Sequence, residues 1–153
     1  MKKIFTWMAV VLLGATSVKA QNPDGLSWAV EAGVGTEFEV GGRAQYKLHD
    51  YVAWDVLNLK YAYDYGKYSA NEISLTTGLR GFSPTFAQDM RLFAGLDVGY
   101  GNRFKDGHSV NCFAMDLTLG VYLTKNLYAG YGFGMLANEG THKDHLFRIG
   151  YNF

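Results

Sequence analysis

The sequence predicts an all-β fold, an eight-stranded antiparallel up-and-down barrel that crosses a membrane. Beyond residue 20, apolar side chains recur at every second position, and no stretch keeps the 3.6-residue spacing of a helix. The chain has 19 Gly but only 2 Pro, and 16% of its residues are aromatic. Aromatic residues favour strands. The face that alternates with the apolar one combines glycine with paired charges, which is typical of a narrow barrel interior.

The N-terminal residues are predicted to be a targeting segment. Lys2 and Lys3 precede an apolar run, and Val18, Lys19 and Ala20 form a cleavage site of the secretory type. We therefore expect a signal peptide over 1–20 and a barrel domain over 21–153. A retained helical anchor is the alternative, but a bilayer-spanning helix needs about 20 apolar residues, more than this run offers.

Charge and cysteine content exclude several classes of protein. Without the three lysines of the signal peptide, 11 basic residues stand against 14 acidic ones, and they form no basic block. The sequence therefore predicts no nucleic-acid partner. Cys112 is the only cysteine, so an internal disulfide is impossible and a small buried side chain is expected.

Alternating apolar positions define eight expected strands. In the strand at 51–63 the apolar face changes phase near Val56 and Leu57, which a β-bulge would explain. Strands of roughly 9–11 residues suffice to cross a membrane at a tilt. The strands are expected at 26–38, 42–48, 51–63, 72–81, 90–101, 110–122, 127–135 and 145–153.

The connections between these strands alternate in character. Compact ones are expected at 49–50, 82–89 and 124–126, and polar ones at 39–41, 64–70, 102–109 and 137–144. An even number of strands places both ends of the barrel domain on one side of the membrane. We expect that side to be the periplasm, with the polar connections outside.

The composition of the polar face indicates that this face points inward. A solvated strand face has no reason to prefer glycine, which weakens strands, whereas a small barrel interior needs glycine where large side chains must fit. An ordinary mixed-charge surface is the alternative. Asp55 and Lys60 are left open by the phase change in their strand. The expected interior charge network is Glu31, Arg43, Lys47, Glu72, Arg80, Arg91, Asp97, Asp116 and Arg148.

Aromatic rings gather near the expected strand ends, where strands would leave the hydrocarbon. Outer-membrane barrels carry such girdles of aromatic residues at both interfaces. The rings in question are Trp28, Tyr46, Tyr51, Trp54, Tyr61, Tyr63, Tyr100, Tyr131 and Tyr151.

The C-terminal pattern resembles the insertion signal of bacterial outer-membrane barrels, with Phe147, Ile149, Tyr151 and Phe153 at the matching positions. Over 26–153 the chain resembles the small eight-stranded OmpA/OmpX-type barrels. The resemblance implies export to the outer membrane of a Gram-negative cell, contact with outer-membrane lipid, and recognition by the barrel-assembly machinery during insertion. The external connections are shorter than those of adhesive relatives, and no external partner is identified.

Three functions are compatible with such a barrel. In the first, side chains fill the interior and the protein has a structural or interaction role without catalysis. In the second, it is a narrow channel for ions or small solutes, opened by Gly130, Gly132 and Gly134 beside Gly120 unless large side chains fill that gap. Those large side chains would be Tyr128, Tyr122 and Phe93.

The third function is an enzyme acting on outer-leaflet lipid. It would need a nucleophile, a base and an acid together at the outer rim, for which the chain offers His108, Ser109, Glu139, His142 and His145. Their spacing fixes no common geometry, and the three-residue spacing of His142 and His145 does not converge two ligands outside a helix. We therefore predict no catalytic residue, no cofactor and no metal site. A lipocalin-type barrel would instead turn its apolar face inward.

Overall fold

The computed structural model describes residues 25–65, 70–87, 89–105, 107–138 and 141–153. The expected signal peptide over 1–20 lies outside the described residues. No helix in the described part of the chain is long and apolar enough to cross a membrane.

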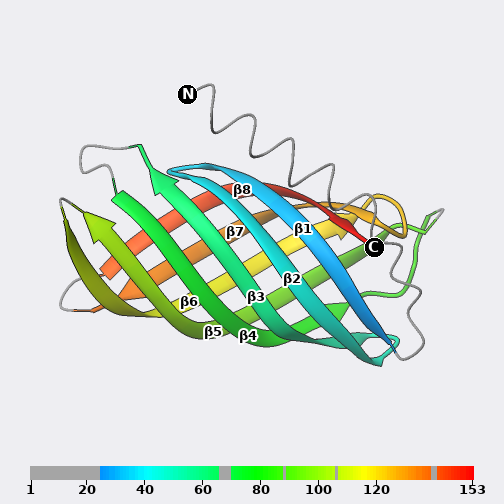
Figure 1. Cartoon of the computed structure of the whole chain (residues 1–153). Helices are drawn as coiled ribbons and strands as arrows, with labels where there is room; N and C mark the ends of the chain where they lie inside the picture. Colours follow the sequence, from blue (N-terminus) through cyan, green and yellow to red (C-terminus); the bar gives the residue numbers. More distant parts are fainter. Residues whose placement is uncertain (1–24, 66–69, 88, 106, 139–140) are drawn as a thin grey trace.

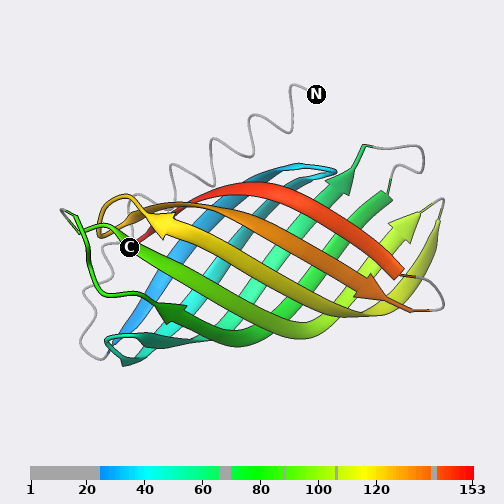
Figure 2. The same cartoon turned by 180° about the vertical axis from the view of Figure 1, so that it is seen from behind.

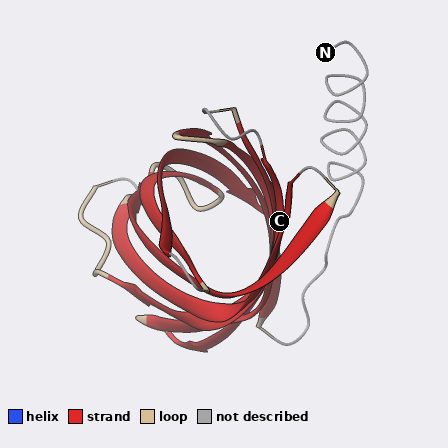
Figure 3. Ribbon diagram, turned by 90° about the vertical axis from the view of Figure 1, so that its left-hand side faces the viewer, coloured by secondary structure: helices blue, strands red, loops and turns tan. Residues whose placement is uncertain are grey.

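Eight antiparallel strands close into one barrel, in which each strand pairs with its neighbours in sequence and the last strand pairs with the first. Figure 1 shows the strands tilted against the barrel axis, and Figure 3 shows the closed ring from one end. The predicted up-and-down barrel is therefore confirmed. The strands are β1 (Leu26–Gly35), β2 (Phe38–His49), β3 (Val52–Asp64), β4 (Ala70–Phe82), β5 (Arg91–Lys105), β6 (His108–Tyr122), β7 (Leu127–Ala137) and β8 (Thr141–Asn152).

The start of β1 and the end of β8 lie at the same end of the barrel, together with the connections β2–β3, β4–β5 and β6–β7 (Figures 1 and 2). We name this end periplasmic and the opposite one outer, after the orientation expected from the sequence. At the periplasmic end the backbone N–H of Phe153 donates to the carbonyl of Trp28 at 2.7 Å, which joins the C-terminal residue to β1.

The predicted bulge lies in β3. Leu57 pairs with Ala44 of β2, but Asp55 pairs with Gln45, so Val56 is an extra residue on the β3 side. A bulge of this kind reverses which side chains face inward on either side of it. The change of phase in the sequence therefore has the expected structural cause.

The first outer connection was predicted in the wrong place. β1 ends at Gly35 and β2 begins at Phe38, so the turn is made by Thr36 and Glu37 rather than by residues 39–41. The N–H of Gly35 closes this turn on the carbonyl of Glu37 at 3.0 Å. Glu39 has the polarity of a loop residue, but it lies in β2 because its side chain enters a charged interior.

The other outer connections are shorter than the sequence predicts, because the strands continue past the apolar segment. The predicted connection over 102–109 is reduced to residues 106–107, that over 64–70 to 65–69, and that over 137–144 to 138–140. At the outer end of the β5–β6 pair the Asn102 amide donates to the Asn111 side-chain oxygen at 2.6 Å. Outside the hydrocarbon a strand has no need of apolar side chains, so polarity there does not mark a loop.

The distribution of side chains is the inverse of that in a soluble protein. Phe147 is 70% exposed and Leu79 57% exposed on the outer surface, whereas Arg43 and Arg80 in the interior are each 1% exposed. An apolar exterior around a polar interior is the pattern of a membrane barrel. Cys112 is buried beside Ala114 and Leu136, as expected.

The aromatic rings that were predicted to form the girdles all lie on this exterior. Four of them lie near the periplasmic ends of their strands, Tyr51 lies in the β2–β3 turn, Tyr61 and Tyr63 lie at the outer end of β3, and Tyr100 and Tyr131 lie within their strands. Each of the nine is exposed in the structure: Trp28, Tyr46, Tyr51, Trp54, Tyr61, Tyr63, Tyr100, Tyr131 and Tyr151.

Candidate functional site

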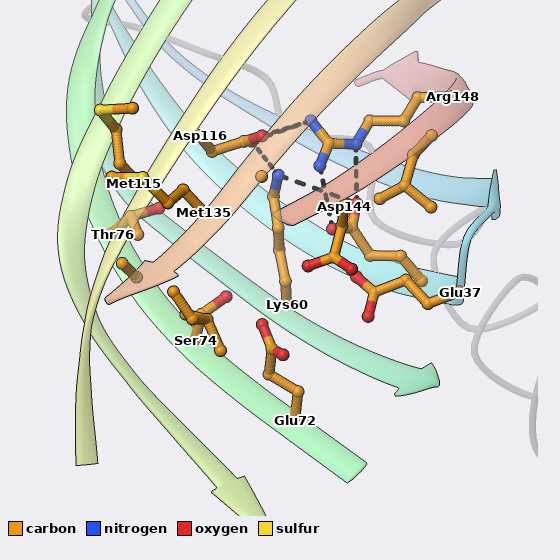
Figure 4. A pocket seen from close by; sticks show the side chains of 15 residues that line it. Glu37, Lys60, Glu72, Ser74, Thr76, Met115, Asp116, Met135, Asp144 and Arg148 are labelled. Carbon is orange, nitrogen blue, oxygen red and sulfur yellow. Dashed lines mark hydrogen bonds and ion pairs between the residues drawn. The ribbon is translucent and has the colours of Figure 1, made fainter. Parts of the chain in front are cut away.

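The barrel interior is occupied by three groups of charged side chains and by a layer of aromatic rings. The central group is built around Arg148 of β8. Its Nη1 lies 2.8 Å from Asp116 Oδ1, and its Nε lies 2.8 Å from Glu39 Oε1. Lys60 of β3 also donates to Asp116 (Figure 4) and lies 3.4 Å from Glu31. Each of these charges faces at least one opposite charge, which is the condition for keeping ions away from water.

A second group of charges adjoins the central one through Glu31. Arg43 Nη1 lies 3.3 Å from Glu31, and the Tyr128 hydroxyl donates to the same carboxylate at 2.7 Å. Asp55 accepts from Arg80 at 3.2 Å, and its other oxygen is 3.6 Å from Arg43. Five strands, β1, β2, β3, β4 and β7, thus contribute to one continuous set of ion pairs and hydrogen bonds across the lumen.

Aromatic rings close the periplasmic half. The ring centroids of Phe93 and Tyr122 lie 5.3 Å apart, and those of Tyr122 and Tyr128 lie 5.2 Å apart. The Arg91 guanidinium carbon lies 4.2 Å from the centre of the Phe82 ring and 4.9 Å from that of Tyr122. Cation–π contacts of this kind hold a cation against a ring face. Tyr122 and Tyr128 are fully buried.

Two of the four glycines that could have opened a channel, Gly120 and Gly132, instead make room for large side chains. A Cβ atom at Gly120 would come within 2.6 Å of the Phe93 ring, and one at Gly132 would overlap the Arg148 guanidinium. Distances this short leave no room for a side chain at either glycine. Phe93 and Arg148 therefore fill the space beside these two glycines.

The third group lies at the outer end and is acidic. Glu37 in the β1–β2 turn, Glu72 of β4 and Asp144 of β8 approach one another together with His142, and their potential ligand atoms lie within 4.8 Å of each other. A cavity of about 30 Å³ lies beside the three carboxylates, as Figure 4 shows. Burial, followed by the nearby charge of Asp144, raises the pKa of Glu37 to about 9.

Most of the residues expected to form the interior charge network point into the barrel. Five of them belong to the two connected groups described above: Glu31, Arg43, Arg80, Asp116 and Arg148. Asp97 accepts from the Asn58 amide at 3.3 Å, whereas Glu72 belongs to the outer acidic group. Arg91 lies at the periplasmic end, where its contacts are aromatic rings.

Lys47 departs from the expectation. Its side chain is 59% exposed, and its ammonium lies 2.6 Å from Asp50 in the β2–β3 turn. Lys47 lies four residues from Arg43 and so has the same strand parity, which means that its side chain points to the same face of β2. It stands, however, near the end of that strand. At the rim a long side chain reaches water, so inward parity does not bury it.

Several interior residues were missed by the sequence analysis. Glu39 and Asp144 had been assigned to connections, and Asp55 and Lys60 had been left open. The usable signal was parity: residues 39, 41 and 43 continue one face of β2, and residues 144, 146 and 148 continue one face of β8. The direction of Asp55 and Lys60 is decided by the bulge, which turns both side chains inward.

The residue types that an enzyme would need are not gathered at one place. His108 and Ser109 are exposed at the start of β6. His145 faces outward, where its ring meets the Tyr131 hydroxyl, while His142 lies beside Asp144 inside the mouth. Glu139 lies outside the described residues. His142 and His145 therefore lie on opposite sides of the barrel wall, and the candidate residues from the sequence do not form a single group.

The closed barrel, the apolar exterior and the ion-paired interior together define a transmembrane β-barrel. No protein-family model matches the chain, and no curated protein sequence matches it either.

Solved structures share the fold at low sequence identity. The N-terminal β-barrel domain of Pseudomonas aeruginosa OprF matches with a TM-score of 0.55 and 16% identity, over 85% of this chain and 98% of that one. Neisserial surface protein A (NspA) matches with a TM-score of 0.55 and 14% identity, over 83% and 92%. The Yersinia pestis outer membrane protein Ail matches with a TM-score of 0.51 and 11% identity, over 85% and 100%. The chain thus has the fold of these small barrels.

Proposed function

We propose that this chain is an integral outer-membrane barrel whose side chains fill the lumen, and that its role is structural or one of interaction, without catalysis. The observation that carries the proposal is the continuous set of contacts across the interior, from Arg148 through Glu31 and Arg43 to Tyr128. An eight-stranded barrel is just wide enough for side chains to fill its interior.

Two features support a plug rather than a pore. The central cations and carboxylates are satisfied by one another, so a passing ion would have to break these pairs in a space that excludes water. The periplasmic rings of Phe93, Tyr122 and Tyr128 add an apolar layer below them. Two of the four glycines that favoured a channel, Gly120 and Gly132, lie against Phe93 and Arg148, so these two give the narrow-channel alternative no support.

Location in the outer membrane is part of the same proposal. The exterior is apolar, and Phe147, Ile149 and Tyr151 form an outward row along β8 that is 70%, 54% and 45% exposed. Together with Phe153 this row is proposed to be the signal that the barrel-assembly machinery reads. Export through a signal peptide over 1–20 is the corresponding first step. Outer-membrane lipid is then the immediate partner of the exterior.

Conductance in a planar lipid bilayer tests the filled interior. The refolded protein is first checked by its shift in gel mobility between unboiled and boiled samples. We expect a folded protein that adds no steady current above the bare bilayer. A variant in which two of the three periplasmic rings are truncated, Phe93→Ala with Tyr122→Ala, serves as the comparison.

Discrete openings of the unmodified protein would overturn the proposal in favour of a channel. Silence of the unmodified protein, with openings in the truncated variant, would assign the block to the periplasmic rings. Silence of both would place the block in the central ion pairs.

A further inference from the structure

The acidic group at the outer mouth differs from the ion pairs below it. It joins three separate elements: the β1–β2 turn through Glu37, the start of β4 through Glu72, and the start of β8 through His142 and Asp144. Glu37, Glu72 and Asp144 are 2%, 8% and 3% exposed. Residues from opposite parts of the barrel wall therefore present four potential ligand atoms to one small space.

The cations of the neighbourhood are engaged elsewhere. Arg103 stands opposite Glu72 in the β4–β5 register, but its guanidinium binds Asp64 at 2.7 Å. Lys60 and Arg148 serve the central group. Within the acidic group the only basic side chain is His142, whose Nε2 lies 2.8 Å from Asp144 Oδ1. Three carboxyl groups are thus held close together with one imidazole among them, while the nearby Arg103 guanidinium is shared with Asp64.

Glu37 gives the independent indication of a ligand. Its side chain is buried and directed at the group, as Figure 4 shows, yet its Oε2 atom has no hydrogen-bond partner within the described part of the chain. Buried polar atoms are nearly always paired with protein, water or an ion. The Glu37 carboxyl group is thus available to a ligand, and the small cavity beside it has room for an atom of about the size of water.

We propose that Glu37, Glu72, His142 and Asp144 bind a divalent transition-metal ion of the zinc or manganese type at the outer mouth. Carboxylate oxygens alone would suit calcium or magnesium, whereas an imidazole nitrogen among the donors favours zinc and its neighbours. Zinc takes nitrogen and carboxylate ligands at about 2.0–2.2 Å, so the side chains would draw together around the ion. The bound ion would tie the first turn to β4 and β8 and cap the outer end of the lumen.

Metal binding to the refolded full-length barrel in detergent micelles tests this proposal. ZnCl2 and, separately, MnCl2 are titrated by isothermal calorimetry, and the thermal unfolding midpoint is recorded with and without the metal. CoCl2 gives a second readout, since visible absorption of the bound ion reports its ligands. The variants are Glu37→Gln, Asp144→Asn and His142→Ala. His108→Ala, a histidine exposed at the same end, is the matched control.

We expect one saturable site in the unmodified protein and in the His108→Ala control, with a metal-dependent rise in the unfolding midpoint. Each site variant should bind at least about tenfold more weakly, since each loses one ligand of a small set. The gel-mobility shift verifies that every variant folds, and Glu37→Gln is expected to fold well because it replaces a buried carboxyl group by a neutral amide of nearly the same shape.

Three results would each overturn the proposal. They are the absence of saturable binding in the unmodified protein, undiminished binding in folded Glu37→Gln and Asp144→Asn, and equal losses in His142→Ala and His108→Ala. The last would show that histidines in general, rather than this group, capture the metal.

Discussion

At the level of single residues, Arg148 has the most consequential position in the interior. Its guanidinium lies 2.8 Å from Asp116 and 2.8 Å from Glu39, which belong to two strands far apart in the sequence. Gly132, on the neighbouring strand β7, has no side chain and so leaves space for the guanidinium. The arginine and the glycine are therefore needed together.

Replacement of Arg148 by Met is expected to lower the free energy of unfolding by about 3–5 kcal/mol, because it leaves buried carboxylates with a single lysine as their counter-charge. Urea unfolding of the protein in lipid vesicles, monitored by gel mobility, measures the change in the free energy of unfolding. Lys125→Met is the control, since that side chain is 77% exposed and its loss should cost less than about 0.5 kcal/mol. Equal effects of the two changes would show that the central ion pairs add nothing to stability.

The residues of the interior were predictable where strand parity could be followed without interruption. Asp97, Asp116 and Arg148 lie in long regular strands, and their inward direction followed from the pattern. Glu39 was missed because a glutamate beside two glycines looks like a loop. Lys47 was wrong for a different reason, since parity gives direction but not depth, and a long side chain at the rim reaches water.

At the level of elements, the bulge in β3 decides which residues of that strand face the lumen. Val56 is the extra residue, and on either side of it Asp55 and Lys60 both become buried. Without the bulge one half of the strand would carry its charges into the lipid. Both charges join the ion pairs of the interior, so the interior network depends on this bulge.

Deletion of Val56 should therefore prevent folding, because a shift of one residue moves every following side chain to the opposite face. The fraction of folded protein, read from the gel-mobility shift after refolding, is expected to fall to near zero. Deletion of Pro84, in the long periplasmic connection between β4 and β5, leaves all strand faces unchanged and should still give folded barrels. A deletion of Val56 that folds as well as this control would contradict the assigned role of the bulge.

The outer ends of the strands show the limit of polarity as a signal. The sequence analysis ended β5 near residue 101, but the strand continues to Lys105 and pairs with β6 as far as His108. A strand outside the membrane is held by its backbone hydrogen bonds and by polar cross-strand contacts such as Asn102 with Asn111. Polar residues there fit a strand as well as a loop.

At the level of the whole molecule, the direction of the apolar face separates a membrane barrel from a soluble one. Leu96 in the middle of β5 is 49% exposed and pairs with Leu79 and Leu117, so it stands in a continuous apolar band. In a soluble protein an exposed leucine could be replaced at little cost. In a bilayer the same position is immersed in hydrocarbon.

Leu96→Arg is expected to cost about 2–4 kcal/mol of folding free energy in vesicles, the penalty for an arginine near the bilayer midplane. Phe104→Arg, on the same face near the outer end of β5, should cost only about 0–1 kcal/mol because it lies close to the interface. Unfolding titrations of both variants give the comparison. A cost below about 0.5 kcal/mol for Leu96→Arg would mean that this face meets water.

The sequence by itself determined the strand count, the alternation of faces and the place of the bulge, since each of these is a local pattern along the chain. The tertiary structure decided which inward side chains meet. Arg43 bonds Tyr128 across 85 positions of sequence, and Arg148 bonds Glu39 across 109. Such pairs depend on the closure of β8 onto β1 and on the register around the ring. The acidic group at the outer mouth has the same origin, because only the closed barrel brings a turn, β4 and β8 to one point.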